Sequence, residues 1–484
     1  MRSWSRASGL LAACSLAGCT TVGPNFKTPD APTAAGYAMP GDPTPTGPAL
    51  SADARAAGPW WRAFGSADLD RVMTEALSGN QNVALAVANV QKAAAQEQSI
   101  RGGLAPRLDA NAGAARERIN FNQFGITFPG VSNPTINLLT VGLNVSYDLD
   151  LFGGGRRKVE TAEAATNAQA RRADAAYLTL TANVARQAVR IAALRDEAAT
   201  LRDIVADDQH NIDIVRRAEA EGGEPSSATP GGVAQLAEDQ ALLPPLDQEI
   251  AQARHALAML VGKSPAEWTA PDFAFQSFTA PAVIPVTLPS TLVRRRPDIL
   301  AAEDDFHADT ARIGVATADL YPDIKLSAGL EQSALTPATL FNYSSTGWTL
   351  ASGLTAPILN GGALKADKRA AEAQARASLA QYKLTVLTAF VQVSDVLAAL
   401  ANDDARLAAD SRAERAAQSS LNDARAAYSL GGGALLPVVV AQRQLNRAKL
   451  TLTQARGQKL MDTVDLYAAT ATDWRDEKTD AAAR

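Results

Sequence analysis

The sequence of 484 residues predicts an α+β membrane protein, in which long coiled-coil helices continue from β-strands and the whole arrangement occurs twice. Three observations lead to this fold class. A heptad pattern extends over about 65 residues from Gly153, a second extends from Gly362 to Tyr428, and four shorter segments alternate apolar and polar residues. At 1.5 Å per residue such helices are roughly 100 Å long. That length suits a rod, a filament or a tunnel, but not a compact domain.

The first heptad pattern is an a/d seam, in which mostly apolar residues recur every seven positions in two series. The series are Tyr177, Val184, Ile191, Ala198, Val205 and Ile212, and Leu180, Gln187, Leu194, Leu201, Asp208 and Val215. In the second pattern the seventh residues are Leu379, Val386, Val393, Leu400, Leu407, Glu414, Leu421 and Tyr428. A strict seven-residue repeat keeps one helix face on a partner and imposes a left-handed supercoil.

The chain begins with the features of a secretory signal, which we predict over residues 1–18. Arg2 and Arg6 precede a short apolar stretch, and Leu16-Ala17-Gly18-Cys19 then looks like a lipobox. Cleavage there would make Cys19 the first residue and attach lipid to it, and no other cofactor is expected. The alternative is ordinary signal cleavage beside an incidental cysteine. An Asp after the cysteine favours inner-membrane retention in bacterial lipoproteins of this kind, so Thr20 favours the outer membrane.

Residues 19–59 are rich in proline and small residues, and we expect a lipid-anchored, extended tether with no core of its own. Removal of the signal lowers the count of basic residues from 46 to 44 against 51 acidic ones. The resulting net charge of about −7 argues against nucleic acid as a partner. No later stretch has the uninterrupted apolar run of a transmembrane helix, so a membrane crossing by the mature chain must use strands.

The first repeat is predicted over residues 60–262. Its two alternating segments, at residues 108–114 and 141–149, are close to the 9–11 residues that a tilted membrane strand needs. A soluble hairpin with one wet face would give the same alternation. The loop between the strands carries aromatic residues that would suit a membrane girdle: Phe121, Phe124 and Phe128.

The rest of this repeat is helical. Gly153-Gly154-Gly155 lacks the Lys and Ser/Thr of a phosphate loop and is interpreted as a strand-to-helix joint. After the long helix the chain turns near Gly222 and returns as a helix that Pro244 and Pro245 should kink.

A linker over residues 263–288 leads to the second repeat, over residues 289–474, and a tail follows at 475–484. The second repeat has alternating segments at 324–330 and 348–358 and a turn at Gly431-Gly432-Gly433. The two repeats also match in sequence, since both return helices carry Val-Ala-Gln, beginning at Val233 and Val440. An internal repeat of this kind outweighs any single motif.

Four strands cannot close a membrane barrel, since the smallest closed membrane barrels have about eight strands. Open sheet edges are not tolerated in lipid. Several chains must therefore contribute strands to one barrel, and the helices that continue from those strands should extend its wall. We expect an oligomeric tube with a β-section in the outer membrane and an α-section that reaches across the periplasm.

Several short motifs occur in order along nearly the whole mature chain. They are Cys19-Thr20-Thr21-Val22-Gly23-Pro24-Asn25-Phe26, Trp60-Trp61, Arg295-Arg296-Pro297-Asp298-Ile299, Ile313-Gly314-Val315-Ala316, Tyr321-Pro322, Pro357-Ile358-Leu359-Asn360-Gly361-Gly362 and Tyr428-Ser429-Leu430-Gly431. In these motifs the chain resembles the outer membrane factor family, the TolC-like and NodT-like exit ducts of tripartite efflux systems. The resemblance implies a homotrimer with a twelve-stranded β-barrel, four strands per chain, and a twelve-helix α-barrel. It also implies two partners, a periplasmic adaptor and an inner-membrane pump of the resistance-nodulation-division (RND) type.

The resemblance further implies functional residues at the two inter-helix turns, which form the periplasmic tip in the family. Adaptor hairpins would dock at turn glycines, although turn formation alone also explains these residues: Gly222, Gly223, Gly431, Gly432 and Gly433. Leu436, Val440 and Arg443 match positions that line or brace the closed aperture. Family members often have Asp immediately before Ala-Gln, where this chain has Val440 and Val233. We therefore expect an apolar ring in place of a carboxylate ring, with seam packing of Val440 as the alternative.

No catalytic constellation is visible, because His210, His255 and His307 are isolated, and neither enzyme activity nor a metal site is expected. The favoured function is an outer membrane exit duct for small toxic compounds or drugs. One alternative is a TolC-like duct for type I polypeptide secretion. Another is a structural coiled-coil lipoprotein of the envelope, which would leave the strands and the duplication unexplained.

Overall fold

The computed structural model describes residues 21–33, 36–43, 49–51, 59–120, 134–222, 225, 228–281, 283–286, 289–431 and 434–470. The signal peptide, Cys19, Gly223, Gly432, Gly433, the three loop phenylalanines and the tail at 475–484 lie outside these residues. The chain divides into two compact units. The first comprises Met1–Pro29, Asn89–Ala170 and Ala301–Tyr382, and the second comprises Asp30–Ala88, Arg171–Leu300 and Lys383–Arg484.

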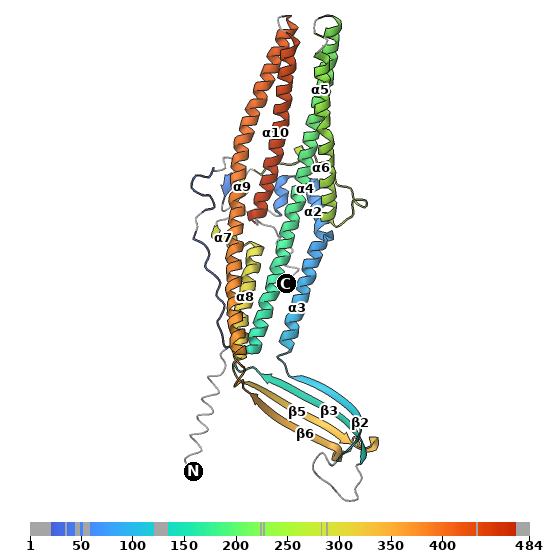
Figure 1. The fold of residues 1–484 in the computed structure, drawn as a ribbon, viewed down its shortest axis with the longest axis vertical. Coiled ribbons are helices and arrows are strands. Elements are labelled where there is room, and N and C mark those ends of the chain that lie inside the picture. Colours follow the sequence, from blue (N-terminus) through green and yellow to red (C-terminus); the bar gives the residue numbers. More distant parts are fainter. Residues whose placement is uncertain are drawn as a thin grey trace. The chain divides into compact units, whose positions relative to one another are not determined.

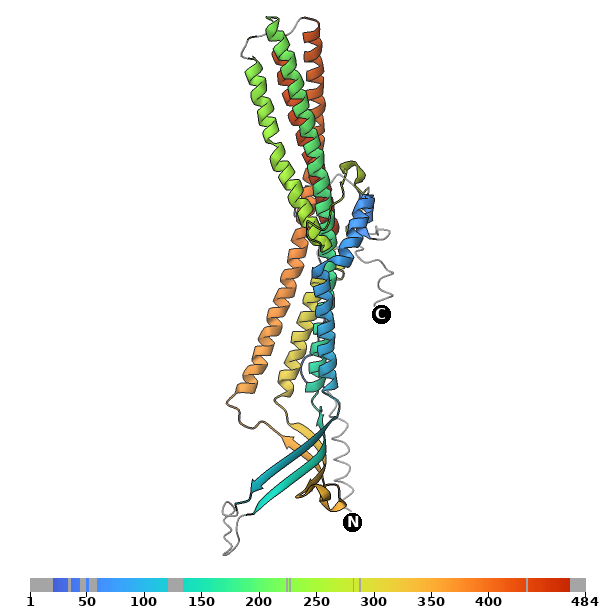
Figure 2. The same ribbon diagram turned by 90° about the vertical axis from the view of Figure 1, so that its right-hand side faces the viewer.

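The first unit contains a four-stranded antiparallel sheet in the order β2-β3-β5-β6 (Figures 1 and 2). Its strands are β2 (Arg107–Arg118), β3 (Thr135–Leu149), β5 (Asp323–Ala334) and β6 (Thr346–Thr355). The central pairing of β3 with β5 joins the two repeats and aligns Leu149 with Ile324. The outer strands β2 and β6 each pair on one side only among the described residues. The fourth strand ends before Ile358, which the alternation had included, because Pro357 has no N–H to donate to a sheet.

Each strand of this sheet is joined to a helix at the same end (Figure 1). The helix α3 (Gln81–Gly102) leads into β2, and β3 leads into α4 (Gly154–Ala220). The second repeat follows the same order with α8 (Pro297–Ala318) before β5 and α9 (Ala363–Ser429) after β6. Both α4 and α9 have 67 residues, so each is about 100 Å long, and the two long helices predicted from the heptads are confirmed.

The second unit contains the helical hairpins and the main apolar core. The first hairpin returns as α5 (Ala228–Ala241) and α6 (Leu243–Val261), and the second returns as the continuous helix α10 (Leu435–Thr470). Pro244 and Pro245 produce a break at Leu242 and not a kink, because prolines fit the first turn of a new helix. In the core, Trp60 stacks on Tyr467 with ring centroids 5.5 Å apart.

The linker and the tether both pack against this unit. The described part of the linker buries Phe273 and Phe278 and donates a hydrogen bond from Trp268 Nε1 to Glu75 Oε2 at 2.8 Å. The linker strand β4 (Val283–Pro285) pairs in parallel with β1 (Ala49–Ser51) of the tether. The tether has no core of its own, but it is bound to α9. Ser394 Oγ donates to the carbonyl of Tyr37 at 2.8 Å.

Further small elements complete the chain. They are the 3₁₀ turns at Trp60–Phe64, Phe275–Ser277, Pro337–Thr339 and Tyr343–Ser345, and the helices α2 (Ala67–Gly79) and α7 (Pro289–Val293).

One expectation about hydropathy was wrong. Helix α9 contains an 18-residue window with a mean hydropathy of 1.8, apolar enough to cross a membrane by length and composition, and only 28% of that window is buried. The helix carries apolar residues on two faces. Val386 and Val393 are buried within the chain, whereas Leu384, Leu387 and Val391 are more than half exposed. A helix that packs on two sides gives this pattern without entering lipid.

Candidate functional site

Glycines with positive φ close the two inter-helix turns at the ends of α4 and α9. Gly222 has φ 79° and Gly431 has φ 72°, values that favour glycine. A Cβ added at either position would have no heavy atom within 4 Å. Turn formation therefore requires glycine at both residues, and the described part of the chain makes no close contact there.

The first turn is closed by a carboxylate from α4. Glu219 accepts hydrogen bonds from the backbone N–H and the hydroxyl of Thr229, both at 2.8 Å. This contact satisfies a free N–H in the first turn of α5 and ties that turn to the end of α4.

A cavity of about 300 Å³, here called the tip crevice, lies between α4, α5 and α10 close to these turns. It brings together the three residues predicted at the aperture: Leu436, Val440 and Arg443. Leu436 is 67% exposed and Val440 is 45% exposed, so neither is buried against a neighbouring helix of the same chain. Arg443 donates a long hydrogen bond to the carbonyl of Gly231 on α5, at 3.5 Å.

A buried glutamine links the helices beside the crevice. Gln442 is 2% exposed and accepts a hydrogen bond from Arg425 of α9 at 2.8 Å. Its amide nitrogen donates to Asp207 of α4 at 3.2 Å and to Asn446 of α10 at 2.9 Å. Because a buried amide that is fully bonded is costly to separate from its partners, Gln442 fixes how α10 packs against α4 and α9.

Asp208 is the buried acidic residue of the crevice. It occupies a d position of the α4 seam between Leu201 and Val215, and it is 7% exposed. Burial raises the pKa of Asp208 to about 7, aided by a hydrogen bond and the charge of Asp239 on α5 and opposed by the charge of Arg443.

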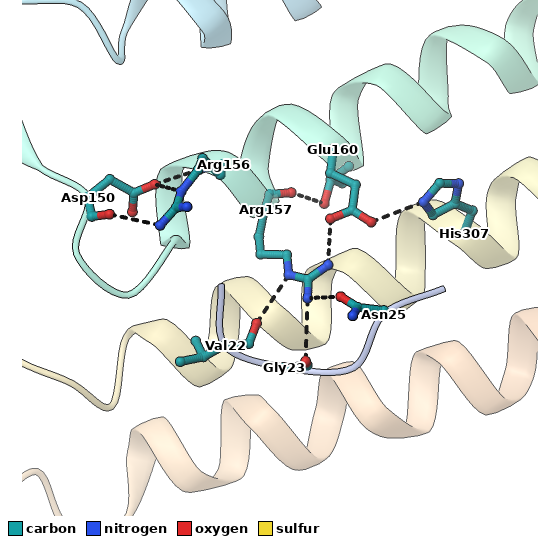
Figure 3. Close-up of polar contacts among 9 residues, drawn as sticks. Val22, Gly23, Asn25, Asp150, Arg156, Arg157, Glu160 and His307 are labelled. Carbon is teal, nitrogen blue, oxygen red and sulfur yellow. Dashed lines mark hydrogen bonds and ion pairs between the residues drawn. The ribbon is translucent and has the colours of Figure 1, made fainter. Parts of the chain in front are cut away.

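A second cluster, here called the N-terminal clasp, holds Val22–Phe26 against α4 and α8 (Figure 3). The guanidinium of Arg157, whose side chain is 3% exposed, donates to the carbonyl of Val22 at 3.1 Å and to Asn25 Oδ1 at 2.8 Å. It also donates to the carbonyl of Gly23 at 3.4 Å and forms an ion pair with Glu160 at 2.6 Å. Arg157 therefore fixes three successive points of the N-terminal segment to the first long helix.

The second repeat completes the clasp through α8. His307 lies 3.1 Å from Glu160 and stacks on the ring of Phe26, with centroids 4.2 Å apart. A Cβ on Gly23 would come within 2.5 Å of the Cα of Gly314, so the segment crosses α8 where both residues lack side chains. The clasp thus joins the N-terminal segment to helices from both repeats.

The clasp adjoins the joint between β3 and α4. The amide of Val22 donates to the carbonyl of Phe152 at 3.0 Å. Asp150 accepts hydrogen bonds at the start of α4, from the backbone N–H of Gly155 at 3.0 Å and from that of Arg156 at 2.9 Å. Figure 3 shows Asp150 beside Arg156. Burial alone would raise the pKa of Asp150, but these hydrogen bonds outweigh it and hold that pKa below its usual value.

The residues predicted at the aperture line one cavity, and their role at an aperture stays a prediction, whereas the clasp was not predicted. Nothing in the local pattern distinguishes Arg157 from other arginines on the long helix, and His307 was taken as isolated. Asp208 did leave a signal, since it interrupts an apolar seam series. Among the described residues, no group of three or more His, Cys, Asp or Glu side chains could hold a metal ion.

Comparison with known proteins identifies relatives over most of the chain. A family model described as "Outer membrane efflux protein" matches residues 72–263 and 288–472, more than half of the sequence. The pyoverdine export outer membrane protein OpmQ of Pseudomonas aeruginosa is 30% identical over 424 residues, covering 87% of this chain and 88% of OpmQ. The probable outer membrane lipoprotein SilC of Salmonella typhimurium is 26% identical, with 95% and 96% coverage.

The solved structures agree with the sequence relatives. The outer-membrane channel OprN superposes with a TM-score of 0.84 at 25% identity, covering 94% of this chain and all of that one. The predicted fold class, with four strands per chain and long helices in a duplicated order, is confirmed.

Proposed function

The chain belongs to the outer membrane efflux protein family, and from this membership we propose that three copies form an exit duct for small toxic compounds or drugs. The relatives are outer membrane channels and not enzymes, and the chain is an outer membrane protein. In the proposal an RND-type pump in the inner membrane drives export, and a periplasmic adaptor connects that pump to the inter-helix turns.

The four-stranded sheet with two open edges carries the proposal. A strand edge exposed to lipid leaves N–H and C=O groups unsatisfied, at several kcal/mol each. Three such sheets joined at β2 and β6 would give twelve strands and no free edge, which is the trimeric arrangement of the structural relatives. The exposed apolar face of α9, formed by Leu384, Leu387 and Val391, supports a helical partner from a neighbouring copy.

The N-terminal clasp supports the proposed lipid anchor on Cys19. Val22 is bonded to Phe152, near the end of β3. Three extended residues span about 10 Å, so lipid on Cys19 would remain close to the end of the membrane strands. The name of SilC as a probable outer membrane lipoprotein agrees with this placement.

The proposal is tested by deleting the gene in its own host and following the accumulation of a fluorescent cationic dye. Loss of the duct should raise intracellular dye, and wild-type protein should restore export. The variant Val141→Pro should fail to do so, because Val141 pairs with both Ala112 and Gln332 in the centre of the sheet and proline cannot bond there. Val141→Thr keeps both ladders and serves as the matched control.

Two results would contradict the proposal. Unchanged accumulation together with loss of one secreted polypeptide would assign the duct to type I secretion. If the deletion leaves dye accumulation unchanged and the purified protein forms no channels in planar bilayers, the chain would instead be a structural lipoprotein of the envelope.

A further inference from the structure

The tip crevice contains a carboxylate oxygen with no partner. Oδ2 of Asp208 is completely buried and receives no hydrogen bond from the described residues. An unpaired polar atom in the interior costs about 1–3 kcal/mol, and more if it is charged. The seam position of Asp208 could carry a leucine or valine at no such cost, as it does one heptad before and after, at Leu201 and Val215.

The charges around Asp208 favour a cation. Two further carboxyl groups act on Asp208 through their charge, Asp207 on α4 and Asp239 on α5. Asp239 accepts a hydrogen bond from Gln235 at 2.9 Å, and Asp207 accepts one from Gln442. Among the described residues, the cation that acts on Asp208 is Arg443 of α10, whose guanidinium donates to the carbonyl of Gly231. Negative charge therefore exceeds positive charge at the base of the crevice.

Part of the crevice wall is apolar, and the crevice has room for a ligand. Asp208 lines the cavity together with apolar side chains from α4 and α10: Ile212, Val439, Leu436 and Val440. The polar part of the lining comes from Asn211, Thr229, Gln235 and Arg443. At the ~30 Å³ that one water occupies in the liquid, about 300 Å³ corresponds to some ten groups of that size. A cavity with one buried acidic group beside an apolar wall matches a ligand with one positive end and a short apolar body.

We propose that the tip crevice binds a small organic cation, with an ammonium or amidinium group on Asp208 and an apolar body against Leu436 and Val440. A bare metal ion fits less well, since the described residues offer no cluster of three metal-ligating side chains. The site lies within one chain and goes beyond the proposed export function. Binding would bridge α4 and α10 beside the proposed aperture.

The test uses benzylamine as the probe and purified full-length protein in detergent, with binding measured by isothermal titration calorimetry. Benzyl alcohol has nearly the same size and apolar body without the charge, and it should bind at least tenfold more weakly. The pKa of Asp208 is about 7, so the fraction of ionised carboxylate falls about tenfold from pH 8 to pH 6. Benzylamine should therefore bind about tenfold more weakly at pH 6 than at pH 8.

Two variants separate the site from general charge effects. Asp208→Asn keeps the shape of the side chain and should weaken benzylamine binding at least tenfold. Asp203→Asn removes an exposed carboxylate of α4 that does not line the crevice, and it should change binding by less than threefold. Equal binding of amine and alcohol by the wild type would overturn the proposal, as would the absence of binding at both pH values. Both comparisons use the wild-type protein, so they hold even if Asp208→Asn fails to fold.

Discussion

Arg157 gives the most direct quantitative test of the N-terminal clasp. The variant Arg157→Met keeps much of the apolar stem but removes the hydrogen bonds to Val22, Gly23 and Asn25. A hydrogen bond from a charged donor contributes about 1.5–3 kcal/mol. Three at the lower limit would total ~4.5 kcal/mol, and we subtract about a third because the bond to Gly23 is long, at 3.4 Å. The expected loss of about 3 kcal/mol corresponds to roughly a hundredfold increase in local opening of the segment.

The assay is amide hydrogen exchange at Val22, whose N–H donates to the carbonyl of Phe152. Exchange from the locally opened state should be about a hundredfold faster in Arg157→Met, while amides in the middle of α4 should keep their rates. The control variant is Arg101→Met on α3. Arg101 also forms ion pairs, with Glu97 and Glu163, but its side chain is 58% exposed, so Val22 exchange should not change. Exchange at Val22 that stays within threefold of wild type in Arg157→Met would refute the central role of the guanidinium.

Four further perturbations test other parts of the chain. Gly431→Val places a β-branched residue at φ 72° with no steric contact, so the free energy of unfolding should fall by about 1–3 kcal/mol and the denaturation midpoint should fall with it. An unchanged midpoint would mean that the turn relaxes. Val440→Asp adds a carboxylate at a half-exposed position of the crevice, and it should increase single-channel conductance in planar bilayers. A variant with wild-type conductance at every salt concentration would place the aperture elsewhere. Burial and a hydrogen bond to Asp462 raise the pKa of Asp403 to about 7, so the folded state holds an extra proton between about pH 4 and 7. The melting temperature should therefore fall as pH rises through that window, and it should fall less steeply in Asp403→Asn. An equal slope in both proteins would contradict that assignment. Cys19→Ser should abolish incorporation of labelled fatty acid, and label on the variant would show that lipid is attached at another residue.

The fold was predictable because its signals are local and periodic. A seven-residue repeat specifies a long packed helix, and alternation over about ten residues specifies a strand with two unlike faces. The order of these elements, repeated twice, then indicated the duplication and the open-edged sheet. The family resemblance predicted that Leu436, Val440 and Arg443 lie together at an aperture, and these three residues line one crevice.

The clasp could not be predicted in this way, because it depends on residues that are far apart in sequence. Arg157 contacts Asn25 across 132 positions and Glu160 contacts His307 across 147. No periodicity links such partners, and each looks ordinary in its own segment. The packing of the linker could not be predicted for a related reason. Phe273 and Phe278 are buried in a core that residues distant in sequence build.

The pairing of β3 with β5 also determines when the membrane section can fold. The β2–β3 and β5–β6 hairpins each join strands that are neighbours in sequence, whereas β3 meets β5 only after α4 to α8 have been synthesised and exported. Non-local strand pairing is slow and leaves edges exposed in the meantime. During that interval the edges of the first hairpin stay open to pairing with other chains. A chain truncated after α8 would lack β5 and β6 and could not complete the four-stranded sheet.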